Sequence, residues 1–237
     1  MNKLIAQLIV LILATTLASN ANATWSIIAV DKETGEIGIA GASCTFDVQG
    51  IASIVPGKGA IVVQAASSYF ARMKGVQLMR SDASTNEILE AMNDKEFEPE
   101  NQQYGILALT PNEKPLVHSG NLIKDWSGSK IGDDFAVLGN ILVGEDVISS
   151  AFSKFDSMRK SALDDRLMGA LKAGEISGGD KRCGSQYARS AFISVYNPTD
   201  GAIIKLSVHG IEKQGQPAVS MLDQQFKNMK TENIESE

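Results

Sequence analysis

Histidine and cysteine are scarce in this chain, which has two of each among its 237 residues. Neither cysteine has the close Cys or His neighbours that a zinc site requires, so we expect no metal. The sequence also lacks a phosphate-binding P-loop, a G-x-S-x-G nucleophile elbow, an H-E-x-x-H motif and a G-x-G-x-x-G motif after a strand. We therefore expect no cofactor. With no elbow, we interpret His118 and His209 as structural rather than as members of a Ser-His-Asp triad.

Positive charge is limited as well. The chain carries 22 basic and 28 acidic residues, a formal net charge of −6. Residues 1–23 contribute one lysine and no acid, so the remainder carries −7. No basic cluster overrides this balance, which argues against nucleic acid or an anionic membrane as a partner.

Only one long apolar run is present, from Leu4 to Leu17, directly after Lys3. Its length is typical of the apolar region of a signal peptide and is short for a membrane span. Ala21-Asn22-Ala23 then supplies the small residues that a signal peptidase reads. We predict that residues 1–23 are a cleavable signal peptide, that Thr24 becomes the first residue, and that the protein is periplasmic or secreted and free of the membrane after processing. A second frame, ending at Ala21, and an uncleaved anchor are the alternatives.

Paired strands dominate the rest of the chain. Apolar, β-branched segments flanking clusters of turn formers predict hairpins over 24–43, 51–65, 103–120 and 191–208, and a further strand over 135–143. Helical spacing predicts helices over 69–79, 145–158, 161–174 and 217–229. A further helix is predicted to start at Ser84, where a capping-box pattern begins. Hairpins outnumber strand-helix-strand units, which predicts a mixed α/β (α+β) fold: a four-layer αββα sandwich of mostly antiparallel sheets. We expect a single domain over 24–229 and a disordered acidic tail over 230–237.

A threonine at a processed N-terminus has chemistry of its own. Its hydroxyl lies beside a free α-amine whose reference pKa is about 7.7–8, so near neutral pH the amine can accept the hydroxyl proton without any histidine. Thr24 is therefore the candidate catalytic nucleophile. The competing explanation is chance, since roughly one cleavage in six leaves Ser, Thr or Cys first on ordinary residue usage.

Four segments resemble one family: TWSIIAVDKETGEIGIAGAS, HSGNLIKDW, DDFAVLGNILVGEDV and GGDKRCGSQ, in this order. They are similar to the Ntn-hydrolase-like family called domain of unknown function 1028, over Thr24 to about His209. Members without a signal typically begin Met-Thr-aromatic-Ser-Ile, so removal of Met exposes the same Thr. The resemblance implies the αββα fold of N-terminal nucleophile hydrolases and supports Thr24 as nucleophile. It implies no substrate.

Further candidates follow by analogy with N-terminal nucleophile hydrolases. Ala66, Ser67 and Ser68 fall between a predicted strand and a predicted helix, where backbone N–H groups can form an oxyanion hole. The alternative is an ordinary helix N-cap by Ser67 or Ser68. Lys58, on the turn before that strand, is a candidate for lowering the pKa of the nucleophile; the alternative is a solvated surface lysine.

Three polar residues are candidates for contacting a ligand. Asn140 stands in an apolar strand next to Gly139 and either orients a substrate or makes a structural hydrogen bond. Asp180 and Arg182 follow Gly178-Gly179 and either face a ligand or pair with each other as a brace of the loop.

Cys44 and Cys183 depart from the family pattern, because many relatives have arginine at the first position and Arg-Gly where Cys183-Gly184 stand. If these basic groups bind a carboxylate in relatives, this protein prefers another ligand. An even number of cysteines in an oxidising compartment makes them a disulfide candidate, and two separate thiols are the alternative. A thiol enzyme using Cys44 would need that thiol free.

These observations lead to two hypotheses. In the first, the protein hydrolyses an amide bond of a small-molecule or peptide-like substrate, with Thr24 as nucleophile. In the second, it keeps the fold as a noncatalytic ligand-binding protein. An exposed, reactive Thr24 favours the first hypothesis, and the formation of a homo-oligomer is left open.

Overall fold

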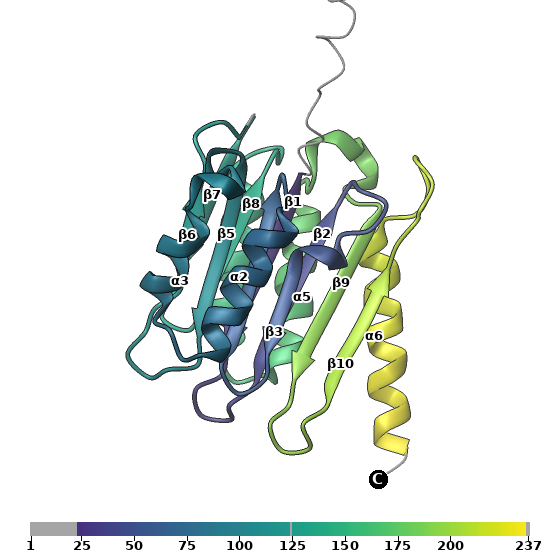
Figure 1. Ribbon diagram of the computed structural model, residues 1–237. Helices are drawn as coiled ribbons and strands as arrows, with labels where there is room; N and C mark the ends of the chain where they lie inside the picture. Colours follow the sequence, from purple (N-terminus) through teal and green to yellow (C-terminus); the bar gives the residue numbers. More distant parts are fainter. Residues whose placement is uncertain (1–22, 124, 236–237) are drawn as a thin grey trace, which may run out of the picture.

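The computed structural model describes residues 23–123 and 125–235 (Figure 1). The predicted signal peptide, apart from Ala23, and the last two residues of the chain lie outside the described residues. Every strand pairing in the two sheets is antiparallel, as the hairpin pattern predicts.

One sheet has six strands and the other has four. The order in the larger sheet is β10-β9-β2-β1-β8-β7, and in the smaller it is β3-β4-β5-β6. The strands are β1 (Thr24–Val30), β2 (Ile37–Ser43), β3 (Ala52–Val55), β4 (Gly59–Ala65), β5 (Gln102–Ala108), β6 (Leu116–Ser119), β7 (Ser127–Ile131), β8 (Phe135–Asn140), β9 (Ser190–Tyr196) and β10 (Ile203–Val208).

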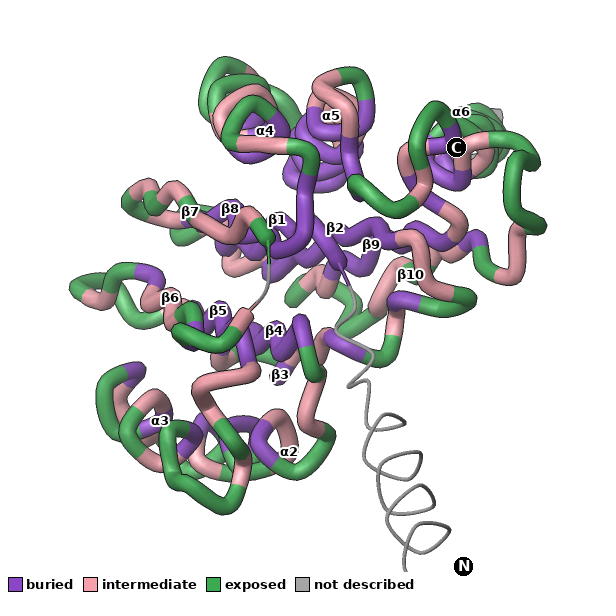
Figure 2. Tube along the Cα trace, turned by 90° about the horizontal axis from the view of Figure 1, so that it is seen from above, coloured by how far each residue is buried: buried purple, intermediate pink, exposed green. Residues whose placement is uncertain are grey.

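Helices cover the outer face of each sheet, so that the molecule has four layers (Figure 2). Two helices, α2 (Tyr69–Arg80) and α3 (Thr85–Met92), pack on the four-stranded sheet. The other three, α4 (Glu145–Ser157), α5 (Leu163–Ile176) and α6 (Ala218–Glu235), pack on the six-stranded sheet. The mixed α/β architecture with two antiparallel sheets and packed helices is therefore confirmed.

Three apolar layers hold these elements together, one under each helix layer and one between the sheets. Strand β1 contributes to two of them by the alternation of its side chains. Trp25 and Ile27 face α5 and its neighbours, whereas Ile28 and Val30 face the other sheet. Because both faces of β1 are covered, all seven of its residues are buried. The first strand is thus at the centre of the molecule.

Two elements differ from the sequence prediction. No strand is predicted between residues 120 and 135, yet β7, of sequence SGSKI, pairs with β8 as an edge strand although it lacks an apolar alternation. Helix α6 continues to Glu235, so the prediction of a disordered tail is wrong for residues 230–235. Lys230 explains part of this extension, since its Nζ lies 2.6 Å from Asp164 Oδ2 on α5.

Candidate functional site

Thr24 opens β1 at one end of the layer between the sheets. Its Cα partners in the ladders are Ser43 on β2 and Asn140 on β8. Alternation along the strand puts Thr24 and Ser26 on the same face as Ile28, which belongs to the core between the sheets. Thr24 is fully buried in the unprocessed chain, so the exposure that would favour the hydrolase hypothesis is not present before residues 1–23 are removed.

Polar side chains replace apolar ones at this end of the inter-sheet layer. Each is fully buried, and together they come from five strands of both sheets. We call them the polar cluster: Thr24, Ser26, Ser43, Gln64, Gln103 and Asn140. Burying polar groups costs free energy unless they hydrogen-bond, so a cluster of this kind requires an internal network.

Gln103 is the centre of that network. Its Oε1 accepts from Gln64 Nε2 at 2.7 Å and from Asn140 Nδ2 at 3.2 Å. Its Nε2 donates to Ser119 Oγ at 2.9 Å and to the Gly139 carbonyl at 3.1 Å. Ser26 Oγ donates to Gln64 Oε1 at 2.7 Å. These bonds join the two sheets directly beneath Thr24.

Asn140 retains one unused acceptor. Within the described residues its Oδ1 is buried and has no hydrogen-bond partner, while its Nδ2 is bonded to Gln103. Leaving a buried acceptor unsatisfied costs about 1–3 kcal/mol. Because Asn140 lies beside Thr24 in the β1–β8 ladder, the vacant acceptor adjoins the candidate nucleophile, where an amine or a ligand N–H could use it.

The carbonyl group just before Thr24 is held by two side chains. Ser43 Oγ donates to the Ala23 carbonyl oxygen at 2.5 Å, and Arg182 Nη2 donates to the same oxygen at 3.1 Å. Ala23 itself is fully buried. The peptide bond that processing would break is thus enclosed, with its oxygen bound by a hydroxyl and a guanidinium.

Asp180 and Arg182 pair with each other, which is one of the two alternatives predicted for them. Asp180 Oδ1 accepts from Arg182 Nε at 3.1 Å, and Oδ2 accepts from Arg182 Nη2 at 2.8 Å. The fully buried Asp180 Oδ2 also accepts the Cys44 N–H at 2.6 Å. The pair therefore braces the loop and also brings Arg182 to the backbone beside Thr24.

A disulfide joins Cys44 to Cys183, with the Cα atoms 5.6 Å apart. Cys44 directly follows the end of β2, and Cys183 lies in the short 3-10 helix η4 (Lys181–Gln186). With both sulfurs bonded, the chain has no free thiol, which excludes a thiol enzyme using Cys44 in this oxidised state.

The segment from Ala66 to Ser68 lies at the same end of the molecule as Thr24, but its hydrogen bonds differ from those of an oxyanion hole. The Ala66 N–H donates to the Asn101 carbonyl, and the Ser68 N–H donates to Gln102 Oε1. Ser68 is the N-cap of α2, and Ser67 Oγ donates to the Val63 carbonyl. The prediction of an oxyanion hole is thus wrong for the Ala66 and Ser68 amides, which internal acceptors occupy.

Lys58 is far from the candidate nucleophile. It precedes Gly59, the first residue of β4, whereas Gln64, whose side chain contacts the Thr24 carbonyl, is near the other end of that strand. Six residues of strand span about 20 Å. Lys58 Nζ instead pairs with the exposed Asp82. Its assignment as a catalytic lysine is wrong, because Lys58 lies at the end of β4 opposite to the Thr24 site.

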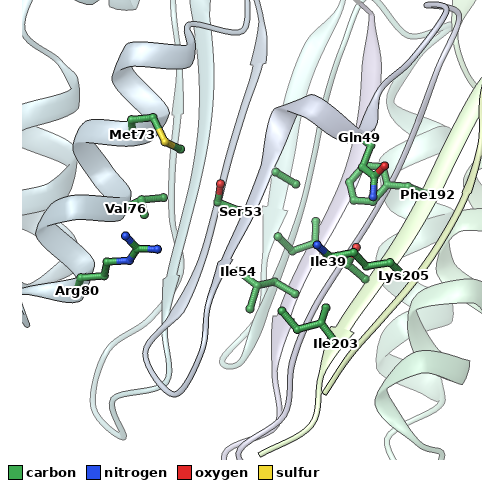
Figure 3. A pocket seen from close by; sticks show the side chains of 12 residues that line it. Ile39, Gln49, Ser53, Ile54, Met73, Val76, Arg80, Phe192, Ile203 and Lys205 are labelled. Atoms are coloured by element: carbon green, nitrogen blue, oxygen red, sulfur yellow. The ribbon is translucent and has the colours of Figure 1, made fainter. Parts of the chain in front are cut away.

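A cavity of about 490 Å³ opens elsewhere between the layers, at β3, α2 and the inner face of β2, β9 and β10 (Figure 3). Its lining is mainly apolar, with Arg80 and Lys205 as its two charged residues. None of the polar cluster lines it. The cavity arises where the six-stranded sheet extends past β3, the edge of the smaller sheet, and it is separate from the Thr24 site.

Exposed apolar side chains gather at the Thr24 end of the molecule. Among the described residues, six of the seven large exposed apolar side chains lie at this end, in the connections that follow β2, β6 and β8, at the start of α2 or at the end of α5. They are Phe46, Tyr69, Phe70, Leu122, Val143 and Ile176, and we call them the apolar rim.

The structure brings together four residues that were predicted from the sequence: Thr24, Asn140, Asp180 and Arg182. Four further members of the site were not predicted: Ser26, Ser43, Gln64 and Gln103. Their signal is a polar residue at an inward-facing position near the end of an otherwise apolar strand. No group of three or more metal-ligating side chains occurs in the described part of the chain. Among the described helices, none has the length and apolar character needed to cross a membrane.

Fold and site define the class: a four-layer αββα protein with two antiparallel sheets and a buried polar cluster around the first residue of its central strand. The sequence model of a family of unknown function, DUF1028, matches residues 24–218. The chain belongs to this family, whose match begins at Thr24.

Among solved structures, the chain is similar to protein SPO2555 from Silicibacter pomeroyi, which is described as DUF1028. The two share 23% sequence identity with a TM-score of 0.74, over 87% of this chain and 88% of the other. At this identity the likeness concerns the fold alone. No curated protein matches the sequence.

Proposed function

We propose that the protein is exported and hydrolyses amide bonds, with Thr24 as the N-terminal nucleophile of the processed chain. The observation that carries this proposal is the position of Thr24: the family match begins at this residue, and its side chain is on the inner face of β1 within the polar cluster. The hydrogen-bonded network of the polar cluster lies beside Thr24 and supplies polar groups for a substrate amide.

The proposed reaction begins when the free α-amine of Thr24 accepts the proton of Oγ1. Oγ1 then bonds to the carbonyl carbon of the substrate, and the π electron pair moves onto the carbonyl oxygen. When this intermediate collapses, the C–N bond of the substrate breaks. The leaving amine takes the proton that the α-amine of Thr24 had accepted, and an ester to Thr24 remains. Water hydrolyses the ester, which regenerates the hydroxyl and releases a carboxylic acid.

The apolar rim supports a substrate with apolar groups on either side of the amide, such as a peptide or an N-acylated small molecule. The rim lies at the same end of the molecule as Thr24, and the polar cluster offers hydrogen-bonding groups for the amide itself. Asn140 Oδ1 supplies an acceptor for an N–H at this point, either that of the Thr24 amine or that of the substrate.

The test uses the full chain, exported in a bacterial host and purified as processed. N-terminal analysis should find Thr24 first. A β-lactone, which acylates nucleophilic hydroxyls, should then label Thr24 in the parent protein, label Thr24→Ser more slowly and leave Thr24→Ala unlabelled. Thr199→Ala, at an exposed turn, is the matched control and should be labelled at the parent rate.

Two outcomes would contradict the proposal. One is a processed protein that starts at Thr24 and stays unlabelled. The other is labelling that survives Thr24→Ala. Either result would favour the noncatalytic ligand-binding protein on the same fold.

A further inference from the structure

The Ala23 carbonyl oxygen marks a hydrogen-bonding position beside Thr24. Only the backbone N, Cα and Cβ of Thr24 separate its Oγ1 from the Ala23 carbonyl carbon, so the two groups that bind the Ala23 oxygen lie close to that hydroxyl. Ser43 Oγ and Arg182 Nη2 already donate to this oxygen. A neutral hydroxyl and a charged guanidinium together suit an oxygen that becomes negative during the reaction.

Building on the proposed function, we propose that Ser43 and Arg182 bind the carbonyl oxygen of the scissile amide, and that the Cys44–Cys183 disulfide positions this pair. Ser43 and Arg182 would be catalytic residues, because they contact the reacting oxygen. They would take the role for which sequence analysis suggested the amides of Ala66 to Ser68.

The disulfide is placed to act on both donors at once. Each half-cystine directly follows one donor in sequence: Cys44 follows Ser43, and Cys183 follows Arg182. The two segments are far apart along the chain, since the cysteines are separated by 139 positions in the sequence. The bond therefore fixes the spacing between the end of β2 and the loop that carries Arg182.

Asp180 links the same two segments by hydrogen bonds. One of its carboxylate oxygens accepts both the Cys44 N–H and Arg182 Nη2, and the other accepts Arg182 Nε. It orients the guanidinium toward the Ala23 oxygen and ties it to the segment that carries Ser43. Asp180, Cys44 and Cys183 are thus positioning residues, since they act through the two donors.

The donor pair is tested by the kinetics of β-lactone labelling of Thr24, separated into a binding constant and a maximal rate of acylation. Ser43→Ala should lower the maximal rate by roughly 100-fold, the typical effect of losing one donor to an oxyanion, and should leave the binding constant nearly unchanged. Arg182→Gln should act in the same direction, and Arg182→Lys should restore part of the rate. Ser194→Ala, on β9 outside the polar cluster, is the matched control.

The positioning role is tested by reduction of the disulfide in the folded parent protein. A dithiol reduces the disulfide to the thiols of Cys44 and Cys183 and is itself oxidised to a cyclic disulfide. The maximal rate should fall at least tenfold and recover on reoxidation, while the circular dichroism spectrum is unchanged. The Cys44→Ser, Cys183→Ser double variant should show the low rate with or without dithiol.

The possible results distinguish the donor assignment, the positioning role of the disulfide and the proposed function. If Thr24 is labelled in the parent and equally fast in folded Ser43→Ala and Arg182→Gln variants, the assignment of the donors is overturned and the proposed function stands. If the reduced, folded protein keeps the parent rate, the positioning role of the disulfide is overturned. If the processed parent protein is not labelled at all, the proposed function itself fails.

Discussion

Glu175 should make the stability of this protein depend on pH near neutrality. It lies on α5 and is 7% exposed; its Oε2 accepts Ser220 Oγ at 3.2 Å, and its Oε1 is without a partner among the described residues. Burial raises the pKa of Glu175 from its usual 4.5 to about 7, against the opposing effects of the Ser220 hydrogen bond and the nearby Lys172.

The sign follows from comparing the folded and unfolded states. Between pH 4.5 and about 7 the unfolded chain has lost the Glu175 proton while the folded protein keeps it. The free energy of unfolding therefore decreases as the pH rises through this interval, and the penalty is complete above pH 7. The rise of the Glu175 pKa from 4.5 to about 7 corresponds to a decrease of about 3 kcal/mol in the free energy of unfolding.

Glu175→Gln removes the charge and keeps the shape of the side chain. We expect it to be about 2–3 kcal/mol more stable than the parent at pH 8 and nearly equal at pH 4.5, measured by urea denaturation followed by circular dichroism. The exposed Glu90→Gln on α3 is the control and should show no such difference. A stability difference between Glu175→Gln and the parent that is constant over pH 4.5–8 would refute the reasoning.

Three further substitutions test the packing by thermal or urea denaturation. Gln103→Leu should lower the free energy of unfolding by about 2–5 kcal/mol, because it removes the centre of the polar cluster and leaves buried partners unsatisfied; a loss below 1 kcal/mol would contradict the network. Arg166→Met should be neutral or stabilising, since Arg166 is buried with Nε and Nη2 unbonded among the described residues and its nearest carboxylate oxygen is 4.0 Å away; a loss above 3 kcal/mol would show that the ion pair matters. Gly174→Ala should cost about 1–3 kcal/mol, because the added Cβ would lie 2.6 Å from Trp25 Nε1, and unchanged stability would mean that α5 shifts freely.

Much of the fold was predictable because it is built from local signals. The capping box at Ser84 and Glu87 is present with both of its reciprocal hydrogen bonds. The turn formers between β9 and β10 close that hairpin by the bond from the Gly201 N–H to the Asn197 carbonyl. Strand β7 was not predictable in this way, because its pairing with β8 depends on the neighbouring strand rather than on its own composition.

The site was predictable only in part, for a related reason. Thr24 and Asn140 stood out by their place in the chain and by their polarity within an apolar strand. Lys58 was misplaced because the direction of β4 relative to β1 cannot be read from local sequence. Ser43 was missed because a serine at a strand end is ordinary until the Ala23 carbonyl is seen beside it.

The polar cluster also has a consequence for how the two sheets assemble. A slip of one residue in any strand would turn its polar side chain out of the network and into an apolar layer. The members of the cluster stand on five strands of the two sheets, so a misaligned strand would leave several buried groups unpaired at once. The polar cluster therefore favours the one register of these strands in which the strand ends that form the site lie together.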